Sequence, residues 1–174
     1  APDAMVLDCG CGGGANIKTL LKLCPNGKVQ GIDYSAVSVE KARKVNARAI
    51  AAGRCTVQQA SVAELPFKAE QFDVVTAFET VYFWPELAQN FREVYRVLKP
   101  GGIFFICNEA NGETTKDDEW TQIIDGMTIY TDADLKVYLE QAGFGRAQSH
   151  KNKKGWLCVT AQKRTSPVWI TRQI

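Results

Sequence analysis

The stretch VLDCGCGGGANIKTL, residues 6–20, decides the fold of this chain. It begins as an apolar run that ends in Asp8, continues through four glycines within residues 10–14, and passes into a segment with helical spacing of apolar residues. Glycine allows backbone angles that other residues avoid, and it lets the main chain come close to a ligand. Free N–H groups at the start of the following helix would face the same place. The stretch therefore predicts a buried strand, a ligand-binding turn and a helix, the first unit of an α/β sheet.

The whole chain has the composition of one ordinary globular domain. It has 174 residues, of which 45% are hydrophobic and 23% charged, with a net charge of +2. The one dense basic run, HKNKK at 150–154, is short and is interpreted as a solvated hairpin turn. No apolar stretch approaches the ~18 residues that would cross a bilayer. We therefore expect neither a nucleic acid nor a membrane as a partner, and the sequence leaves the oligomeric state open.

The six cysteines are spread through mostly apolar runs. Only Cys9 and Cys11 are close together, and their spacing is not typical of zinc sites or redox pairs. We expect small buried thiols, no metal site, and a reducing compartment, which favours the cytoplasm.

Short apolar runs alternate with segments of helical periodicity along the rest of the chain. This alternation predicts an α/β domain with a mainly parallel sheet. The expected strands are residues 4–9, 29–33, 55–61, 72–78, 102–109, 145–151 and 155–163. The last two are expected to form a closing antiparallel hairpin, because only a few turn residues separate them.

Capping residues and apolar stripes predict four helices between these strands. The first follows the glycines and ends before PNG at 25–27, the second runs from Ser35 to Gly53, the third runs from Pro85 to Pro100-Gly101, and the last begins with a cap from Thr131 to Asp134. Residues 62–71 connect two strands without a full helix, and their reach of ~33–36 Å is enough to cross three strand spacings. The chain is expected to form a single domain over residues 1–174.

A polar segment at 111–130 is interpreted as a lid. Within it Trp120, Ile123 and Ile124 have helical spacing, which predicts a short helix. Additions of this kind cover the ligand crevice in α/β folds, and we expect the specificity for the substrate to come from this segment.

Two classes of ligand compete for the glycine loop. The pattern Gly10-x-Gly12-x-x-Ala15 matches a dinucleotide fingerprint, and Asp33 lies at the usual distance further on. Asp8 favours the other class, since a carboxylate before the first glycine repels a pyrophosphate and attracts a cationic amine or sulfonium.

A nicotinamide oxidoreductase stays an alternative, because Tyr95-x-x-x-Lys99 has the spacing of a hydride-transfer pair. Lys99 precedes a predicted strand, however, and would lie at the edge opposite the ligand crevice. We interpret the spacing as a coincidence on a helix surface.

Six motifs in order make the chain resemble class I S-adenosylmethionine-dependent methyltransferases, the group that includes quinone-biosynthesis and many small-molecule enzymes. They are VLDCGCGGG, GIDYSAVSVEKAR, AELPF, FDVVTAFETVYFWPE, REVYRVLKPGG and YLEQAGF. The resemblance implies a three-layer, doubly wound Rossmann-like α/β fold with strand order 3-2-1-4-5-7-6 and an antiparallel strand 7. It implies methyl transfer from S-adenosylmethionine to a small-molecule acceptor by in-line displacement, with a non-catalytic S-adenosylmethionine-binding domain as the alternative. In most relatives an upstream helix closes over the cofactor. Since this sequence starts almost at its first predicted strand, we expect it to lack that N-terminal helical segment.

The same resemblance implies the residues that hold S-adenosylmethionine. The loop beside its methionine part is Asp8, Gly10, Gly12 and Gly14, and Asp33 holds the ribose hydroxyls. A carboxylate can accept two such hydrogen bonds, but Asp33 also has the position of a helix-capping acid.

The remaining cofactor contacts lie at or just after the ends of three predicted strands, 29–33, 55–61 and 72–78. Tyr34 is expected against the adenine, and the carbonyl of Phe78 is expected to receive the methionine amine. Ser61 stands where relatives commonly have the acid that accepts the adenine amino group, and a hydroxyl accepts this bond less strongly. The N–H of Val62 is expected near the same ring.

Candidate general bases follow two strands at this edge. Methyl transfer to a hydroxyl or an acidic carbon requires a base near the methyl group. Glu79 and Tyr82 are the predicted catalytic residues, and Glu109 is interpreted as a solvated rim residue. Trp84 has two interpretations, as an aromatic neighbour of the sulfonium and as a core anchor.

Overall fold

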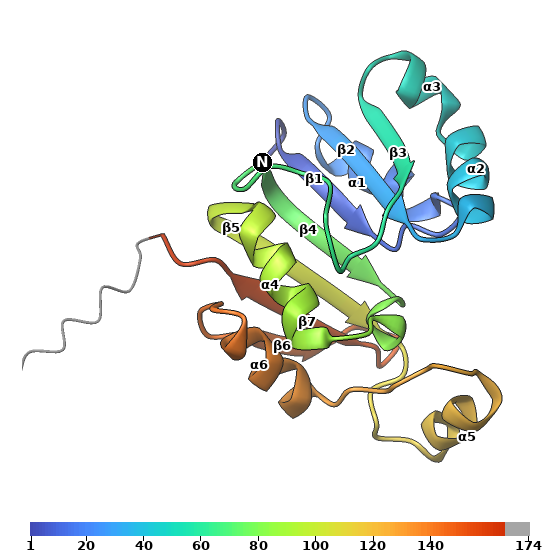
Figure 1. Cartoon of the computed structure of the whole chain (residues 1–174), viewed down its shortest axis with the longest axis vertical. Coiled ribbons are helices and arrows are strands. Elements are labelled where there is room, and N and C mark those ends of the chain that lie inside the picture. Colours follow the sequence, from blue (N-terminus) through green and yellow to red (C-terminus); the bar gives the residue numbers. More distant parts are fainter. Residues whose placement is uncertain (166–174) are drawn as a thin grey trace, which may run out of the picture.

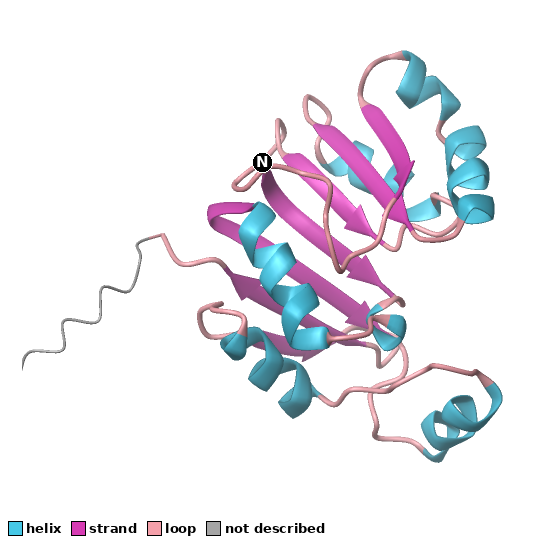
Figure 2. Cartoon of the chain, in the orientation of Figure 1, coloured by secondary structure: helices cyan, strands magenta, loops and turns pink. Residues whose placement is uncertain are grey.

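One seven-stranded sheet lies between two layers of helices (Figures 1 and 2). The computed structural model describes residues 1–165, without the side chains of residues 115, 116 and 118. The strands are β1 (Met5–Cys9), β2 (Lys28–Asp33), β3 (Cys55–Gln59), β4 (Phe72–Phe78), β5 (Leu98–Asn108), β6 (Gln148–Lys151) and β7 (Leu157–Gln162). The helices are α1 (Ala15–Leu23), α2 (Ala36–Val45), α3 (Ala47–Ala51), the 3-10 turn η1 (Val81–Phe83), α4 (Leu87–Val97), α5 (Thr115–Ile123) and α6 (Asp132–Gln141).

The order of the strands is β3-β2-β1-β4-β5-β7-β6. Strands β1 to β5 are parallel, and β7 runs antiparallel between β5 and β6. This topology confirms the predicted order and the predicted closing hairpin. The chain order reverses between β1 and β4, and in open α/β sheets such a reversal opens a ligand crevice beyond the carboxyl ends of the strands.

Strand β1 shows how the sequence divides between the two faces of the sheet. Leu7 and Cys9 belong to the core cluster with α4 and α6, whereas Val6 belongs to the cluster with α1 and α2. Alternate residues of a strand point to opposite faces, so a continuous apolar run predicts a strand that is covered on both sides. The structure confirms this arrangement, in which the cyan helices of Figure 2 flank the magenta sheet.

Aromatic rings fill the core beneath α4. The ring centroids of Phe91 and Phe104 are 5.3 Å apart, and Trp84 stacks on Phe104 at 6.2 Å. Edge-to-face and offset pairs of this kind add to the stabilisation from burying each ring. Trp84 is therefore a core anchor, the second of the two interpretations left open by the sequence.

The single helix expected from Ser35 to Gly53 is instead broken at Asn46. Ser35 does cap α2, since its hydroxyl accepts the Ser38 N–H at 3.3 Å. The buried Asn46 side chain donates to the carbonyls of Gly14 and Ala42, at 3.0 and 2.9 Å. Asparagine competes with regular helix bonding in this way, and α3 continues as a separate short helix.

The prediction that Pro100-Gly101 closes the third helix is wrong. Helix α4 begins at Leu87 and ends at Val97, and Leu98 is already extended and paired with Phe72 of β4. Pro100 and Gly101 lie inside β5, which therefore starts earlier than the expected 102–109. The register shift between Phe72 and Val74 lets the strand accommodate this start.

Other boundaries differ by a few residues. The hairpin strands are shorter than the expected 145–151 and 155–163, because turn residues occupy their ends, and β3 stops at Gln59. The capping box from Thr131 to Asp134 is confirmed, and a short helix, α5, lies within the predicted lid. Residues 166–174 of the predicted domain lie outside the described residues. Within residues 1–165 no helix is long and apolar enough to cross a membrane.

Candidate functional site

The glycine loop turns sharply at the carboxyl end of β1. The N–H groups of Gly10 and Cys11 both donate to the Ile32 carbonyl of β2, at 2.8 and 2.9 Å. Gly10, Gly12 and Gly14 have φ values of +73°, +50° and +79°. These angles belong to the left-handed region, where glycine alone is free of strain, so the local sequence fixes the shape of the turn.

The three glycines nevertheless serve different purposes. A Cβ on Gly10 would lie 2.1 Å from Thr80 Oγ1, and a Cβ on Gly14 would lie 2.5 Å from Asn46 Nδ2. These two glycines thus allow close packing within the protein. A Cβ on Gly12 would have no heavy atom within 4 Å, so Gly12 borders the open space that a ligand could enter.

Asp8 lies beneath this loop and is 1% exposed. Its Oδ1 accepts the Thr76 hydroxyl at 2.7 Å, whereas its Oδ2 is buried without a hydrogen-bond partner among the described residues. Burial raises the pKa of this carboxyl from 3.8 to about 7. A buried carboxylate with an unpartnered oxygen fits a cationic ligand group better than a phosphate.

Asp33 ties the loop to the end of β2. Its Oδ2 accepts the Gly12 N–H at 2.9 Å, and its Oδ1 accepts the Ser35 N–H at 2.9 Å. Ser35, and not Asp33, is the N-cap of α2, so Asp33 acts as a capping acid only through its bond to the Ser35 N–H. Each carboxylate oxygen has a second lone pair, so Asp33 can still accept hydroxyls from a ligand.

The other predicted cofactor residues follow the neighbouring strands at the same edge. Tyr34 is 78% exposed, and the Ala60 N–H donates to the Asp33 carbonyl at 3.0 Å, which brings the segment of Ser61 and Val62 close. The Ser61 hydroxyl is occupied by the Ala63 N–H at 3.2 Å. Phe78 ends β4, and its ring packs edge-on against Phe105 at 5.7 Å.

Glu79 has an unusual backbone for a residue that is not glycine. Its φ is +56°, and its N–H donates to the Cys107 carbonyl at 3.0 Å. Its Oε1 accepts the backbone N–H of Glu109 and the Tyr82 hydroxyl. Burial raises the pKa of Glu79. Strained backbone of this kind is concentrated at functional sites, and the sequence contained no signal for it.

Tyr82 is buried, and its hydroxyl links Glu79 after β4 to Ala110 after β5. Its hydroxyl accepts the Ala110 N–H at 3.0 Å and lies 3.3 Å from both the Ala110 carbonyl and Glu79 Oε1. Burial and the nearby Glu79 charge raise the pKa of Tyr82. The geometry favours a role in positioning Glu79 over direct contact with a substrate.

A cavity of ≈ 200 Å³ joins Glu79 and Tyr82 to the predicted lid. It is lined by Glu79, Tyr82, Phe83, Glu109, Ala110, Trp120, Ile124 and Met127. The Thr128 N–H donates to the Tyr82 carbonyl at 2.9 Å, which anchors the segment after α5. In Figure 1 α5 lies beyond the carboxyl end of β5, apart from the two helical layers. Glu109, interpreted from sequence as a rim residue, thus lies beside Glu79 in one cavity.

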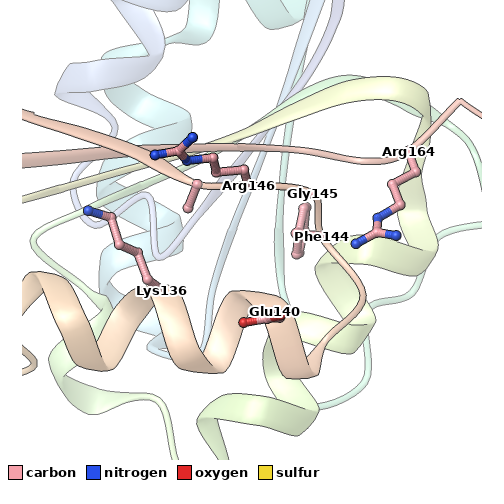
Figure 3. Close-up of a pocket in the computed structure, with 7 residues that line it drawn as sticks. Lys136, Glu140, Phe144, Gly145, Arg146 and Arg164 are labelled. Atoms are coloured by element: carbon pink, nitrogen blue, oxygen red, sulfur yellow. The ribbon is translucent and has the colours of Figure 1, made fainter.

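A larger cavity of ≈ 430 Å³ lies elsewhere and is lined by Lys136, Glu140, Phe144, Gly145, Arg146, Ala147 and Arg164 (Figure 3). The Gly145 N–H donates to the carbonyl of Gln162, the last residue of β7, at 3.0 Å, and the following Lys163 accepts the Gly101 N–H in the first part of β5. This places the cavity toward the edge of the sheet opposite the glycine loop, so we assign the site to the smaller cavity.

Comparison with known proteins identifies the class. Residues 7–106 match the family model described as a methyltransferase domain, and the chain belongs to this family. It is 38% identical over 112 residues to a demethylmenaquinone methyltransferase of Lactiplantibacillus plantarum, covering 64% of this chain and 47% of the relative. It is 30% identical over 128 residues to 24-methylenesterol C-methyltransferase 2 of Arabidopsis thaliana, covering 72% of this chain and 35% of the relative.

The fold matches as well. A solved S-adenosylmethionine-dependent methyltransferase from Aquifex aeolicus superposes with a TM-score of 0.78 at 23% identity, covering 91% of this chain and 81% of that one. The predicted family and fold are confirmed, and S-adenosylmethionine is the cofactor of this class. The chain spans less than half the length of the curated relatives it matches.

The position of Lys99 gives no support to the alternative of a nicotinamide oxidoreductase. Lys99 lies at the start of β5, and its Nζ pairs with Asp73 at 2.8 Å. This is the edge of the sheet away from the glycine loop, as the sequence indicated.

Proposed function

We propose that this chain is the catalytic domain of an S-adenosylmethionine-dependent methyltransferase that acts on a small, largely apolar acceptor. One observation carries the proposal. Gly10 of the glycine loop lies against Thr80, the residue after Glu79, so the loop and the cavity lined by Glu79 are held next to each other in the sequence of contacts. A cofactor on one side of this contact and an acceptor on the other would be held close together, which is the main requirement of in-line transfer.

The residues on the glycine side fit S-adenosylmethionine. Asp8 would attract its positive charges from beneath the loop, and Asp33 would accept the ribose hydroxyls. Tyr34 would lie against the adenine, with Ser61 and Val62 at the edge of the ring and the Phe78 carbonyl toward the amine. When bound, the cofactor supplies a methyl group that is already activated, so the protein has mainly to position the acceptor.

On the acceptor side, Glu79 is the proposed general base. Its pKa is raised by the partial burial of its carboxyl, which suits proton uptake. Tyr82 is proposed as a positioning residue, since its buried hydroxyl holds Glu79 and the end of β5 together. The α5 segment would act as a lid that excludes water from the cavity.

An apolar acceptor is supported by the walls of the cavity and by the relatives. Phe83, Trp120, Ile124 and Met127 supply apolar surface, and Trp120 is 48% exposed. The two relatives described above are named for a sterol and for a demethylmenaquinone. We propose a cytoplasmic location, supported by six buried cysteines that are all free thiols.

Two titrations and one labelling experiment test the proposal. S-adenosylhomocysteine is expected to bind in calorimetry and to raise the melting temperature, whereas NAD is expected to do neither. Protein with radiolabelled S-adenosylmethionine and a metabolite extract is then expected to label a small molecule. Binding without transfer would favour the non-catalytic alternative, and stabilisation by NAD alone would overturn the assignment of the loop.

A further inference from the structure

We propose that the methyl acceptor is a small amine, bound as its cation between Glu79 and Glu109 with its apolar part against Phe83 and Trp120. This inference rests on the proposed function and names the chemical class of its substrate. It starts from the charge of the cavity. Among the described residues that line it, two are glutamates and none is lysine, arginine or histidine.

The Glu79 side chain is held against the backbone of Glu109, and both glutamates line the cavity. Glu79 Oε1 accepts the backbone N–H of Glu109, and the left-handed backbone of Glu79 directs the side chain toward the end of β5. Glu79 Oε2 and the Glu109 carboxylate make no hydrogen bond or ion pair among the described residues. Two carboxylates without counter-charges repel each other, and a bound cation would relieve this repulsion.

Aromatic rings complete a site for a cation. Tyr82 and Phe83 pack edge to face with their centroids 6.1 Å apart, and Trp120 lines the same cavity. Ring faces attract ammonium groups, and an alkyl or aryl body would lie against the same rings. A hydroxyl acceptor could use one carboxylate as its base but would leave the second unpaired. A carboxylated acceptor would be repelled by both.

The chemistry balances with the groups present. The bound ammonium gives one proton to the Glu79 carboxylate and becomes a neutral amine with a free lone pair. Its nitrogen forms a bond to the methyl carbon while the carbon–sulfur bond breaks and its electron pair stays on sulfur. The product is an N-methylammonium ion, and the proton on Glu79 passes to the solvent.

Three probes of similar shape test the charge preference, namely 2-phenylethylamine, 2-phenylethanol and phenylacetate. Each is titrated calorimetrically into the protein with and without saturating S-adenosylhomocysteine. We expect the amine to bind at least tenfold more tightly than the alcohol, and phenylacetate to bind most weakly. Alcohol binding equal to or tighter than amine binding, or no measurable binding of the amine, would overturn the inference.

Glu109→Gln sharpens the test because it removes one charge and keeps the shape. It is expected to reduce the amine-to-alcohol preference to threefold or less without changing the affinity for S-adenosylhomocysteine. The matched control is Glu113→Gln, which neutralises a glutamate outside the cavity lining that pairs with Lys151. An unchanged preference in Glu109→Gln, or an equal loss in the control, refutes the cation site.

The readouts separate this inference from the proposed function. If S-adenosylhomocysteine binds and label appears on the alcohol but not on the amine, methyl transfer stands and the amine assignment fails. If S-adenosylhomocysteine does not bind at all, the proposed function fails, and the probe titrations without it still report the charge preference of the cavity.

Discussion

The two halves of the candidate site are built in opposite ways. The glycine half is held by its main chain, with the N–H groups of Gly10, Cys11 and Gly12 bonded to residues at the end of β2. The glutamate half is held by side chains that reach across about thirty positions of sequence, from Glu79 and Tyr82 to the residues after β5. The difference teaches that the backbone shape of the proposed donor half follows from its glycines, whereas the proposed acceptor half depends on side-chain packing between distant segments.

Gly10→Ala should have the largest effect on stability, because it disrupts the contact of Gly10 with Thr80, which joins the two halves of the site. The new Cβ would lie 2.1 Å from Thr80 Oγ1 at a φ of +73°. The left-handed backbone alone costs ~1–2 kcal/mol, and overpacking adds ~1–3 kcal/mol. We expect the free energy of unfolding, measured in urea, to fall by ~3 kcal/mol or more.

Gly12→Ala is the matched control, with φ at +50° and no atom within 4 Å of the new Cβ. It should cost only ~1 kcal/mol of stability while weakening the binding of S-adenosylhomocysteine. Equal losses of stability in the two variants would contradict the distinction between a packing glycine and a ligand-facing glycine.

Asp8→Asn should raise the stability of the ligand-free protein and lower the affinity of the glycine loop for S-adenosylmethionine. Burial raises the Asp8 pKa from 3.8 to about 7, so the folded state keeps this proton to a higher pH than the unfolded state. The contribution of this group is therefore most favourable below about pH 4 and is lost as the pH rises through about 7. At ~1.4 kcal/mol per pKa unit the full effect is at most ~4 kcal/mol.

At pH 8 we therefore expect the asparagine variant to be more stable than the natural protein by ~2–4 kcal/mol, with nearly equal stabilities at pH 4. Its affinity for S-adenosylmethionine should fall about tenfold, because the negative charge beneath the loop is lost. Urea unfolding at both pH values and calorimetry provide the measurements. Lower stability of the variant at pH 8 would show that the carboxylate is compensated in the folded protein.

The glycine half of the site could be predicted from the sequence to a greater extent than the glutamate half. The strand, turn and helix around residues 6–20 were predictable, because glycine angles and apolar alternation act within a few residues. The strand order came from the resemblance and not from periodicity. The break at Asn46 was missed because it depends on the Gly14 carbonyl, 32 residues away in sequence.

The proposed acceptor side was predictable only as a set of residue types. Glu79 and Tyr82 were identified as candidates, but a left-handed backbone at Glu79 has no sequence signature in a residue other than glycine. The burial of the Tyr82 hydroxyl follows from its bond to Ala110, which no local pattern encodes. Glu109 is exposed, as the rim interpretation expected, but the bond from its backbone N–H to Glu79 arises only when β4 and β5 lie side by side.

Tyr82→Phe should have an intermediate effect and should act on the glutamate half alone. It removes the acceptor of the buried Ala110 N–H, and an unsatisfied buried group costs ~1–3 kcal/mol. Because Glu79 also loses a hydrogen bond, we expect kcat to fall more than KM changes, with unaltered affinity for S-adenosylhomocysteine.

The control for this variant is Tyr95→Phe. The Tyr95 ring packs on Phe144 at 5.1 Å, and its hydroxyl makes no hydrogen bond among the described residues. It should keep both stability and kcat. A kcat in Tyr82→Phe equal to that of the natural protein would show that Glu79 is positioned without the hydroxyl.

Trp120→Ala should have the smallest effect on stability and yet a clear effect on the acceptor. The indole is 48% exposed on α5, so its truncation should lower the free energy of unfolding by less than ~1 kcal/mol. The loss of apolar wall should raise KM for the acceptor several-fold, while Ile123→Ala, at a residue that is 76% exposed and outside the cavity lining, should leave KM unchanged. If Trp120→Ala instead weakens S-adenosylhomocysteine, then α5 covers the glycine half as well, and the two halves of the site are not separable as the contacts indicate.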